Sequence, residues 1–513
     1  MAAGNRLSER EIKVVMGGLM AGLLLAALDQ TIVATALPTI VGDLGGLEQL
    51  SWVVTAYLLT STASLPLYGK VSDLYGRRAV FQAAIVVFLA GSVLAGMAGS
   101  MVQLILARGL QGVGGGGLIA LSMTIVGDVI APRERGRYQG YIGAVWAFAS
   151  VMGPLAGGFL TDRLTWRWVF FVNVPVGLAA LVVTTGALRV PFVRRPHRID
   201  LPGAALLVAG AVCVLLVSVW GGTTYPWSSP VIASLAGGAV VLLGAFLWWE
   251  RRAAEPILPL ELFGVRSFAV ASAASFVVGA SLFGVLVFLP LYLQTVQGES
   301  ATGSGLLLVP MMLGIVVASV AAGRAISRTG RYRAFPVAGM AIAGVGTFLL
   351  SRLTARAGPF DASFGMFVVG TGIGLTMQVL VLAVQNAVRH RHLGSATSAV
   401  TFFRSIGGTL GVAAYGALFA AALQARLGRI LPGGAGVRPG ALVDSPAAIR
   451  ALPAPVRAAV AEAIAASLRT VFLAAIPLVL AGLVLVLALP QVPLRETAHV
   501  GPTGAVEGLE EAS

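Results

Sequence analysis

Long runs of apolar residues recur along almost the whole chain of 513 residues, and they constrain its fold more than any other feature. About 20 apolar residues cross a lipid bilayer as a helix, which satisfies its own backbone hydrogen bonds there. The chain is 57% hydrophobic and 11% charged, with a mean hydropathy of +0.89, whereas soluble domains carry about 25% charged residues. We expect an all-α polytopic membrane protein with fourteen transmembrane spans, at about 14–37, 52–68, 79–98, 101–127, 138–160, 168–188, 203–220, 230–249, 268–293, 303–323, 334–351, 362–387, 396–421 and 468–489.

The net charge of +14 follows this topology and does not indicate a nucleic-acid partner. Most Lys and Arg residues fall in the N-terminal tail or in loops after even-numbered spans, and positively charged loops stay in the cytoplasm. We therefore predict that both termini are cytoplasmic and that the chain is surrounded by the lipid bilayer. The preference for Arg over Lys is typical of a GC-rich bacterial genome, so the predicted location is a bacterial cytoplasmic (inner) membrane.

A charged loop occurs twice in the sequence. Gly69-Lys-Val-Ser-Asp-Leu-Tyr-Gly-Arg-Arg78 follows the second span, and a diverged copy, Gly323-Arg-Ala-Ile-Ser-Arg-Thr-Gly-Arg331, follows the tenth. Duplicated halves of this kind build many transporters, so we predict two six-helix bundles with inverted repeats plus two inserted helices. The expected domains are an N-terminal six-helix bundle (1–190), a linker with two inserted spans (191–262), a C-terminal six-helix bundle (263–495) with a long extracytoplasmic loop (422–467), and a disordered cytoplasmic tail (496–513).

Glycine-rich segments recur at the same offset of eight spans. Gly112–Gly117 lies in the fourth span and 370–374 in the twelfth, while Gly153–Gly158 lies in the fifth and 407–411 in the thirteenth. Small residues let membrane helices approach closely, and this alone explains any single segment. Their recurrence in corresponding spans also favours two related halves.

Asp29 is the exception among the acidic residues, because it lies well inside an apolar span. A charge there costs at least about 2.5–3.5 kcal/mol, which makes it a functional candidate. Arg108 in the fourth span lies at nearly the same depth, and Gln111 is one turn further along the same face. Protonation of Asp29 would release an ion pair with Arg108 and shift a conformational balance. Alternatively, Asp29 joins helices by hydrogen bonds to Gln30 or Thr31, and Arg108 only extends toward the membrane surface or donates to backbone carbonyls.

The first charged loop is a candidate cytoplasmic gate, formed by Gly69, Asp73, Gly76, Arg77 and Arg78. An acid among cations in a glycine-bounded turn can form ion pairs that break and re-form, although solvated charges would give the same sequence. The sequence contains no catalytic set, metal-ligand cluster or phosphate-binding loop. We therefore expect no enzymatic activity, no metal, no cofactor and no use of ATP.

These motifs resemble the major facilitator superfamily and, within it, the fourteen-span drug:proton antiporters. Leu28–Pro38 resembles that family's first-span signature, and Gly69–Arg78 resembles the cytoplasmic-loop motif of the superfamily. Arg108–Gly114 is similar to the fourth-span motif, Gly153–Gly158 to the antiporter motif of the fifth span, and Trp166–Gly177 to the stretch that begins the sixth.

The resemblance covers roughly residues 14–490 and implies a role for each motif. Asp29, Arg108 and Gln111 would couple protons, and Gly153, Pro154, Gly157 and Gly158 would belong to the motif associated with export. Ala34 stands where the first-span signature usually has Asn. The tenth and thirteenth spans lack the acids of some relatives that export divalent cationic drugs, which disfavours polycationic substrates. The residues expected to line a substrate cavity are Trp52, Tyr57, Trp146, Phe283, Tyr292, Gln378, Gln385, Asn386 and Arg404.

The sequence thus predicts a proton-coupled exporter of lipophilic small molecules or drugs that works by alternating access. Its expected partners are the substrate, protons and the bilayer. The loop 422–467 could bind an extracytoplasmic partner or could be an inert connector. Two alternatives remain. The same fold could move lipids or an endogenous metabolite, or the chain could be a membrane sensor or scaffold that transports nothing.

Overall fold

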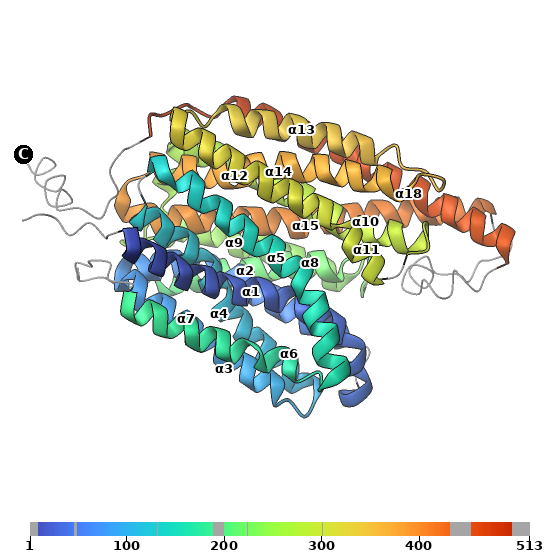
Figure 1. Cartoon of the computed structure of the whole chain (residues 1–513), viewed down its shortest axis with the longest axis horizontal. Helices are drawn as coiled ribbons and strands as arrows, with labels where there is room; N and C mark the ends of the chain where they lie inside the picture. Colours follow the sequence, from blue (N-terminus) through green and yellow to red (C-terminus); the bar gives the residue numbers. More distant parts are fainter. Residues whose placement is uncertain are drawn as a thin grey trace, which may run out of the picture.

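The computed structural model of the chain describes residues 9–45, 49–130, 132–187, 200–222, 224–299, 301–430 and 453–494, which form helices joined by turns (Figure 1). The helices before the predicted linker are α1 (Glu9–Leu44), α2 (Leu50–Tyr75), α3 (Arg77–Gly96), α4 (Met101–Val129), α5 (Pro132–Arg163), α6 (Trp168–Phe171) and α7 (Asn173–Ala187). Those after it are α8 (Leu201–Trp220), α9 (Pro230–Glu250), η2 (Leu260–Gly264), α10 (Arg266–Thr295), α11 (Ala301–Leu307), α12 (Val309–Thr329), α13 (Ala334–Leu350), α14 (Pro359–Ala387), η3 (His390–His392), α15 (Leu393–Ile430) and α18 (Ala454–Leu487).

Twelve helices within the described residues are long and apolar enough to cross a membrane. All fourteen apolar segments expected from the sequence are helical, but α2 and α13 do not reach that standard. Helix α13 is apolar but has only 17 residues. Helix α2 is long enough, but hydroxyl side chains between Thr60 and Ser64 reduce its hydropathy. Thr60 uses its hydroxyl to donate to the Gly109 carbonyl of α4, at 2.7 Å.

The helices form two groups with a shared pattern of contacts (Figure 1). In the first, α4 contacts both α2 and α3; in the second, α14 contacts both α12 and α13. Glycines allow these approaches, because a side chain on Gly114 would collide with the backbone of α3 at Phe88 and one on Gly372 would collide with the backbone of α13 at Ala343. The predicted pairing of the two glycine-rich segments therefore has a structural counterpart in corresponding helix contacts.

Both copies of the charged loop turn at a glycine that has a positive φ. Gly76 ends α2 with φ 91° and Gly330 ends α12 with φ 69°. Residues with a Cβ rarely adopt a positive φ, so each copy needs glycine at this position. The retained second glycine of the repeat thus ends a helix in each half, although ψ is 142° at Gly76 and 0° at Gly330.

The two groups meet at one end of the molecule (Figure 1). At that end α2 contacts α15, α5 contacts α12, and α4 contacts α15. Gly69 of α2 lies against Gly394 of α15 here, and we call the end that carries Gly76 and the 388–392 turn the loop face. In Figure 1 it lies at the left, and the ribbons of the two groups diverge toward the right. The inserted pair α8 and α9 lies beside the seam, where α8 contacts α2 of one group and α15 of the other.

The loop predicted at 422–467 is shorter at both ends than the sequence suggested. Helix α15 continues to Ile430, and α18 begins at Ala454 and runs unbroken into the last apolar span. The segment Val456–Ser467, which lies within the predicted loop, is therefore the first part of α18, because its Ala-rich sequence favours continued helix. Residues 431–452 and the predicted tail 496–513 lie outside the described residues.

We expect Gly114→Leu to destabilise the protein, because the new side chain would overlap the backbone of α3. Overpacking of this kind costs roughly 1–3 kcal/mol, which a lower apparent melting temperature would report. Gly237→Leu in the middle of α9 is the matched control, since a side chain there meets no neighbouring atom. Equal melting temperatures for the two variants would contradict the close contact of α4 with α3.

Candidate functional site

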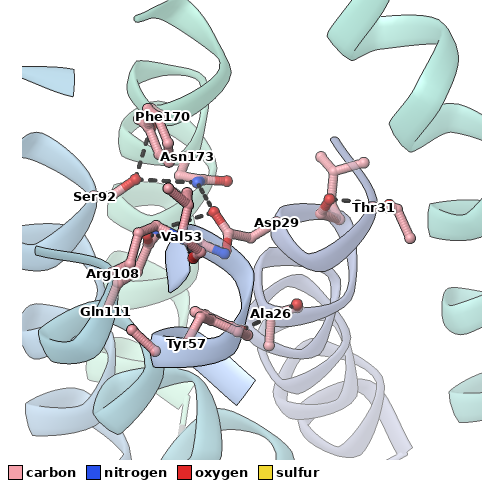
Figure 2. Close-up of polar contacts among 12 residues, drawn as sticks. Ala26, Asp29, Thr31, Val53, Tyr57, Ser92, Arg108, Gln111, Phe170 and Asn173 are labelled. Atoms are coloured by element: carbon pink, nitrogen blue, oxygen red, sulfur yellow. Dashed lines mark hydrogen bonds and ion pairs between the residues drawn. The ribbon is translucent and has the colours of Figure 1, made fainter. Parts of the chain in front are cut away.

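Asp29 and Arg108 form an ion pair in the interior of the first helix group (Figure 2). Arg108 Nη1 lies 2.5 Å from Asp29 Oδ2, and the side chains of Arg108 and Asp29 are 1% and 0% exposed. Gln111 closes the triangle, because its Oε1 accepts from Arg108 Nη1 at 2.7 Å and its Nε2 donates to Asp29 Oδ1 at 2.8 Å. The predicted proximity of these three residues is therefore confirmed, while their role in proton coupling stays a prediction.

Asn173 completes the cluster and was not singled out from the sequence. It begins α7, and its Nδ2 donates to Asp29 Oδ1 and to Ser92 Oγ, at 3.1 Å each. Ser92 in turn donates to the Phe170 carbonyl at 2.8 Å. The signal that could have found Asn173 is an amide placed between apolar residues in the stretch Trp166–Gly177.

Arg108 is also held from its other sides. Its Nε donates to the Val53 carbonyl at 3.1 Å, and its guanidinium carbon lies 4.4 Å from the centre of the Tyr57 ring. Tyr57 is 0% exposed and donates to the Ala26 carbonyl of α1 at 3.3 Å. Tyr57 was predicted to line a substrate cavity; it lies instead in the wall of the ion-pair cluster (Figure 2).

The arrangement gives Asp29 three donors, from Arg108, Gln111 and Asn173. Together they stabilise the carboxylate, which would be costly to bury among apolar helices without such partners. A proton added to Asp29 would cancel its attraction for Arg108 and leave a buried guanidinium without its counter-ion. The cluster can therefore exist with Asp29 ionised or protonated, and the second state requires a new partner for the Arg108 guanidinium.

The Gly153–Gly158 segment brings α5 against α1 close to Asp29. A side chain on Gly153 would collide with Thr31, and one on Gly157 would collide with Thr35. Thr31 also donates to the Ala149 carbonyl of α5 at 2.9 Å. The other two residues of the segment face elsewhere: Pro154 is exposed, and Gly158 has open space beside it.

The predicted gate motif forms a second charged cluster at the loop face. Arg77 bonds to Asp73 Oδ1 and to Asp128 Oδ2, each at 2.6 Å, and donates to Ser72 Oγ at 2.5 Å. Asp128 ends α4, so this cluster joins α2, α3 and α4. Arg78 is the second residue of α3 and is half-buried.

Asp73 also connects the two helix groups. Its Oδ2 accepts from the backbone N–H and the hydroxyl of Ser395 at the start of α15, both at 3.2 Å. A side chain on Gly69 would collide with Ser398 and with the Gly394 carbonyl, so α2 and α15 are in close contact here. Asp73 lies beyond the apolar part of α2, and burial raises the pKa of its carboxyl although the charge of Arg77 opposes that rise.

The other candidates for a substrate cavity fall into two classes. Tyr292 is 1% exposed and donates to the Thr354 carbonyl at 2.8 Å, and Asn386 donates to the Pro493 carbonyl at 3.0 Å, so both join segments of the second helix group. Trp52 lies edge-on to Trp220 of the inserted helix α8, with ring centres 5.4 Å apart. These three side chains are engaged in packing in this conformation.

The remaining candidates lie closer to the boundary between the two groups. Gln385 donates to the Met123 carbonyl of α4 at 3.1 Å, which makes it a contact between the groups. Trp146 on α5 is half-buried and Phe283 on α10 is 38% exposed. Gln378 and Arg404 are different again, since both have buried polar atoms that find no hydrogen-bond partner among the described residues.

The comparisons with known proteins agree with this fold. The sequence model of the Major Facilitator Superfamily matches residues 19–412. An uncharacterized MFS-type transporter of Mycobacterium tuberculosis is 47% identical over 436 residues, which make up 85% of this chain and 63% of that protein. The multidrug transporter protein MdtP of Bacillus subtilis is 38% identical over 431 residues, or 84% of this chain and 78% of that protein.

A solved structure shares the architecture at low sequence identity. The human organic anion transporter MFSD10 (TETRAN) aligns with a TM-score of 0.62 and 16% identity, over 92% of this chain and 100% of that chain. At this identity the likeness concerns the fold alone.

We expect Arg108→Gln to lower the free energy of unfolding by about 3–5 kcal/mol, because it leaves the Asp29 carboxylate buried without its counter-ion. The double variant Asp29→Asn with Arg108→Gln removes both charges and should recover part of that loss. Arg167→Gln is the control, because its ion pair with Asp43 is 35% and 49% exposed and should contribute at most about 1 kcal/mol. Additive losses in the double variant, measured by denaturation of the purified protein, would contradict a coupled pair.

We expect Asp73→Asn to loosen the contact between α2 and α15, because it removes the ion pair with Arg77 and weakens the bonds from Ser395. A cysteine at Ser398, in a Cys213→Ala background, should then react about fivefold faster with a water-soluble maleimide, as a loss of about 1 kcal/mol predicts. Asp43→Asn, which removes an exposed ion pair, is the control. An unchanged labelling rate for Asp73→Asn would show that this carboxyl does not hold the two groups together.

Proposed function

Since the chain belongs to the Major Facilitator Superfamily, whose members are transporters and not enzymes, we propose that it is a proton-coupled exporter of lipophilic small molecules or drugs. It would exchange one or more protons for each substrate molecule by alternating access. The relatives named as a multidrug transporter protein and as multidrug resistance protein 3, both from Bacillus subtilis, support this substrate class. The chain spans only 63% of the length of its relative from Mycobacterium tuberculosis, so the activity of the whole protein is part of the proposal.

The observation that carries the proposal is the buried Asp29 carboxylate with its three donors. A structural hydrogen bond between helices needs no charge, and a charge in this position is costly. A carboxyl group that exchanges a proton must be ionised in part of its cycle, which gives a reason for the charge. Arg108 would then respond to the proton, because it loses its counter-ion when Asp29 becomes neutral.

The clusters at the loop face support alternating access. We place this face in the cytoplasm from the positive charge of its loops, with both termini on the same side of a bacterial cytoplasmic membrane. The Asp73–Ser395 contact and the close approach of α2 to α15 then close the cytoplasmic side in the described conformation. In the proposed cycle these contacts separate when the protein opens inward, and all fourteen helical segments, α2 and α13 included, cross the membrane.

The membrane potential can supply the energy for export. One elementary charge that crosses 100 mV releases about 2.3 kcal/mol, before any pH difference is counted. Each tenfold gradient of substrate costs about 1.4 kcal/mol. One proton for each neutral substrate molecule is therefore sufficient for a substrate gradient of more than tenfold.

The test is substrate-driven proton movement in liposomes that contain the purified protein and a pH-sensitive dye. We expect cationic, neutral or anionic lipophiles from a mixed panel to trigger proton flux with the wild-type protein and at least about tenfold less with Asp29→Asn. Asp43→Asn serves as the matched acid, because its ion pair with Arg167 is exposed. Full coupling in Asp29→Asn would refute the assigned role, and movement of fluorescent lipid without proton flux would replace the proposal with lipid transport.

A further inference from the structure

Arg404 on α15 carries a positive charge that nothing in the described structure neutralises. Its Nη1 is buried and has no hydrogen-bond partner. The other cation on this helix with described contacts is different, because Arg426 donates to the Ala422 carbonyl at 3.1 Å, to Ser467 at 3.4 Å and to Thr470 at 3.1 Å. Arg404 is thus a deep guanidinium with unused donors in an apolar helix bundle.

No acidic side chain of its own helix group is placed to pair with it. Helices α10–α15 and α18 contain two acids, Asp361 and Glu462. Both are exposed, Asp361 in the first turn of α14 and Glu462 in the third turn of α18, at the end opposite to the loop face. In the other group, Asp29 is already engaged by Arg108. No ion pair joins Arg404 to an acid within the part of the chain that the structure describes, so a counter-ion would come from outside that part.

Arg404 lies on the face of α15 that is turned to the interior. Residues three or four apart share a face of a helix, which places Thr397, Thr401, Arg404 and Gly408 in one stripe. Thr397 bonds to Gln385 of α14 at 3.3 Å, and Thr401 contacts the sulfur of Met123 on α4 at 3.7 Å. A side chain on Gly408 would collide with the Phe283 ring of α10. Arg404 therefore faces the space that α4, α10 and α14 enclose with α15.

Gln378 lies at the same depth on the neighbouring helix. Helices α14 and α15 run in opposite directions, and the Gln385–Thr397 bond fixes their register. Gln378 is seven residues before Gln385 and Arg404 is seven residues after Thr397, so both lie about 10 Å further from the loop face. The Gln378 side chain is 3% exposed, yet neither its Nε2 nor its Oε1 has a hydrogen-bond partner.

Two buried polar groups without hydrogen-bond partners at one level of a membrane bundle cost free energy, and helix packing alone does not require them. A planar guanidinium and an amide N–H are the donors that bind a carboxylate or sulfonate well. Phe283 of α10 lies against Gly408, one turn beyond Arg404, and is 38% exposed, so it offers an aromatic surface to an apolar group attached to that anion. A cavity of about 10 Å³ beside Gln378, lined by α12 and α14 of the second group, has room for about one water molecule, so an anion would bind only in a more open arrangement of these helices.

We propose that Arg404 and Gln378 form a subsite for the acidic group of a lipophilic organic anion, with Phe283 against its apolar part. The inference rests on the proposed export function and narrows its substrate class. It assigns Arg404 as the residue that selects negative charge and Gln378 as a second donor to the same group. An anion bound here would neutralise the guanidinium that the chain itself leaves without a counter-ion.

The test compares two probes of similar shape and opposite charge, 1-pyrenesulfonate and (1-pyrenyl)trimethylammonium. Their equilibrium binding to the purified full chain in lipid nanodiscs is measured by fluorescence anisotropy. We expect Arg404→Gln to reduce the ratio of anion to cation affinity about tenfold or more, the loss of one charge-assisted hydrogen bond. Arg404→Lys should retain more of the ratio than Arg404→Gln, and Gln378→Leu should reduce it about threefold to tenfold.

Arg426→Gln is the control, because it removes a cation from the same helix whose donors are already engaged by the chain. If Arg404→Gln does not fold, Arg404→Lys and Gln378→Leu decide the question. An affinity ratio that is unchanged in these variants, or wild-type protein that binds only the cation, would overturn the subsite. If the subsite is overturned in either of these ways but the cation still drives proton flux, the export function is retained. If binding is charge-selective but no compound drives proton flux, export is refuted and the subsite is retained.

Discussion

A carboxylate and a guanidinium in contact at 2.5 Å, both almost fully buried, set the main constraint on the first helix group. Neither charge is tolerable alone in an apolar bundle, and breaking such a pair costs more than the pair itself contributes. Asp29 therefore fixes α1 against α4, and the amides of Gln111 and Asn173 are needed to satisfy the remaining carboxylate oxygen. The glycines of α4, such as Gly114, let α2 and α3 approach closely enough to exclude water from the pair.

Helix α4 physically joins the two charged clusters. It carries Arg108 near its outer end and Asp128 at the loop face, where Asp128 binds Arg77 at 2.6 Å. The two positions are 20 residues apart, or about 30 Å along one continuous helix. Between them, the Met123 carbonyl accepts a bond from Gln385 of the second helix group. In the proposed cycle, a change in the charge of Asp29 would move α4 and so act on both the gate and the contact between the groups.

The positions of charged residues in apolar spans were the feature that could be predicted best from the sequence. Depth counted from helix ends was enough to pair Asp29 with Arg108, and the repeated loop was enough to locate the turns at Gly76 and Gly330. The sequence did not show which face of each helix is turned to the interior, because every face of these spans is apolar. For that reason Asn173 was not singled out, while Tyr292 was assigned to a cavity although it packs within its own group.

The most direct test of coupling between Asp29 and the helix groups is the distance between their outer ends as the pH changes. Spin labels at Phe159→Cys on α5 and Phe360→Cys on α14, both exposed positions, would report it in a Cys213→Ala background. Coupling through Asp29 predicts that the distance distribution shifts when the pH is lowered, and that Asp29→Asn abolishes this dependence. The same pH-dependent shift in Asp29→Asn would contradict it and place the proton-binding group elsewhere.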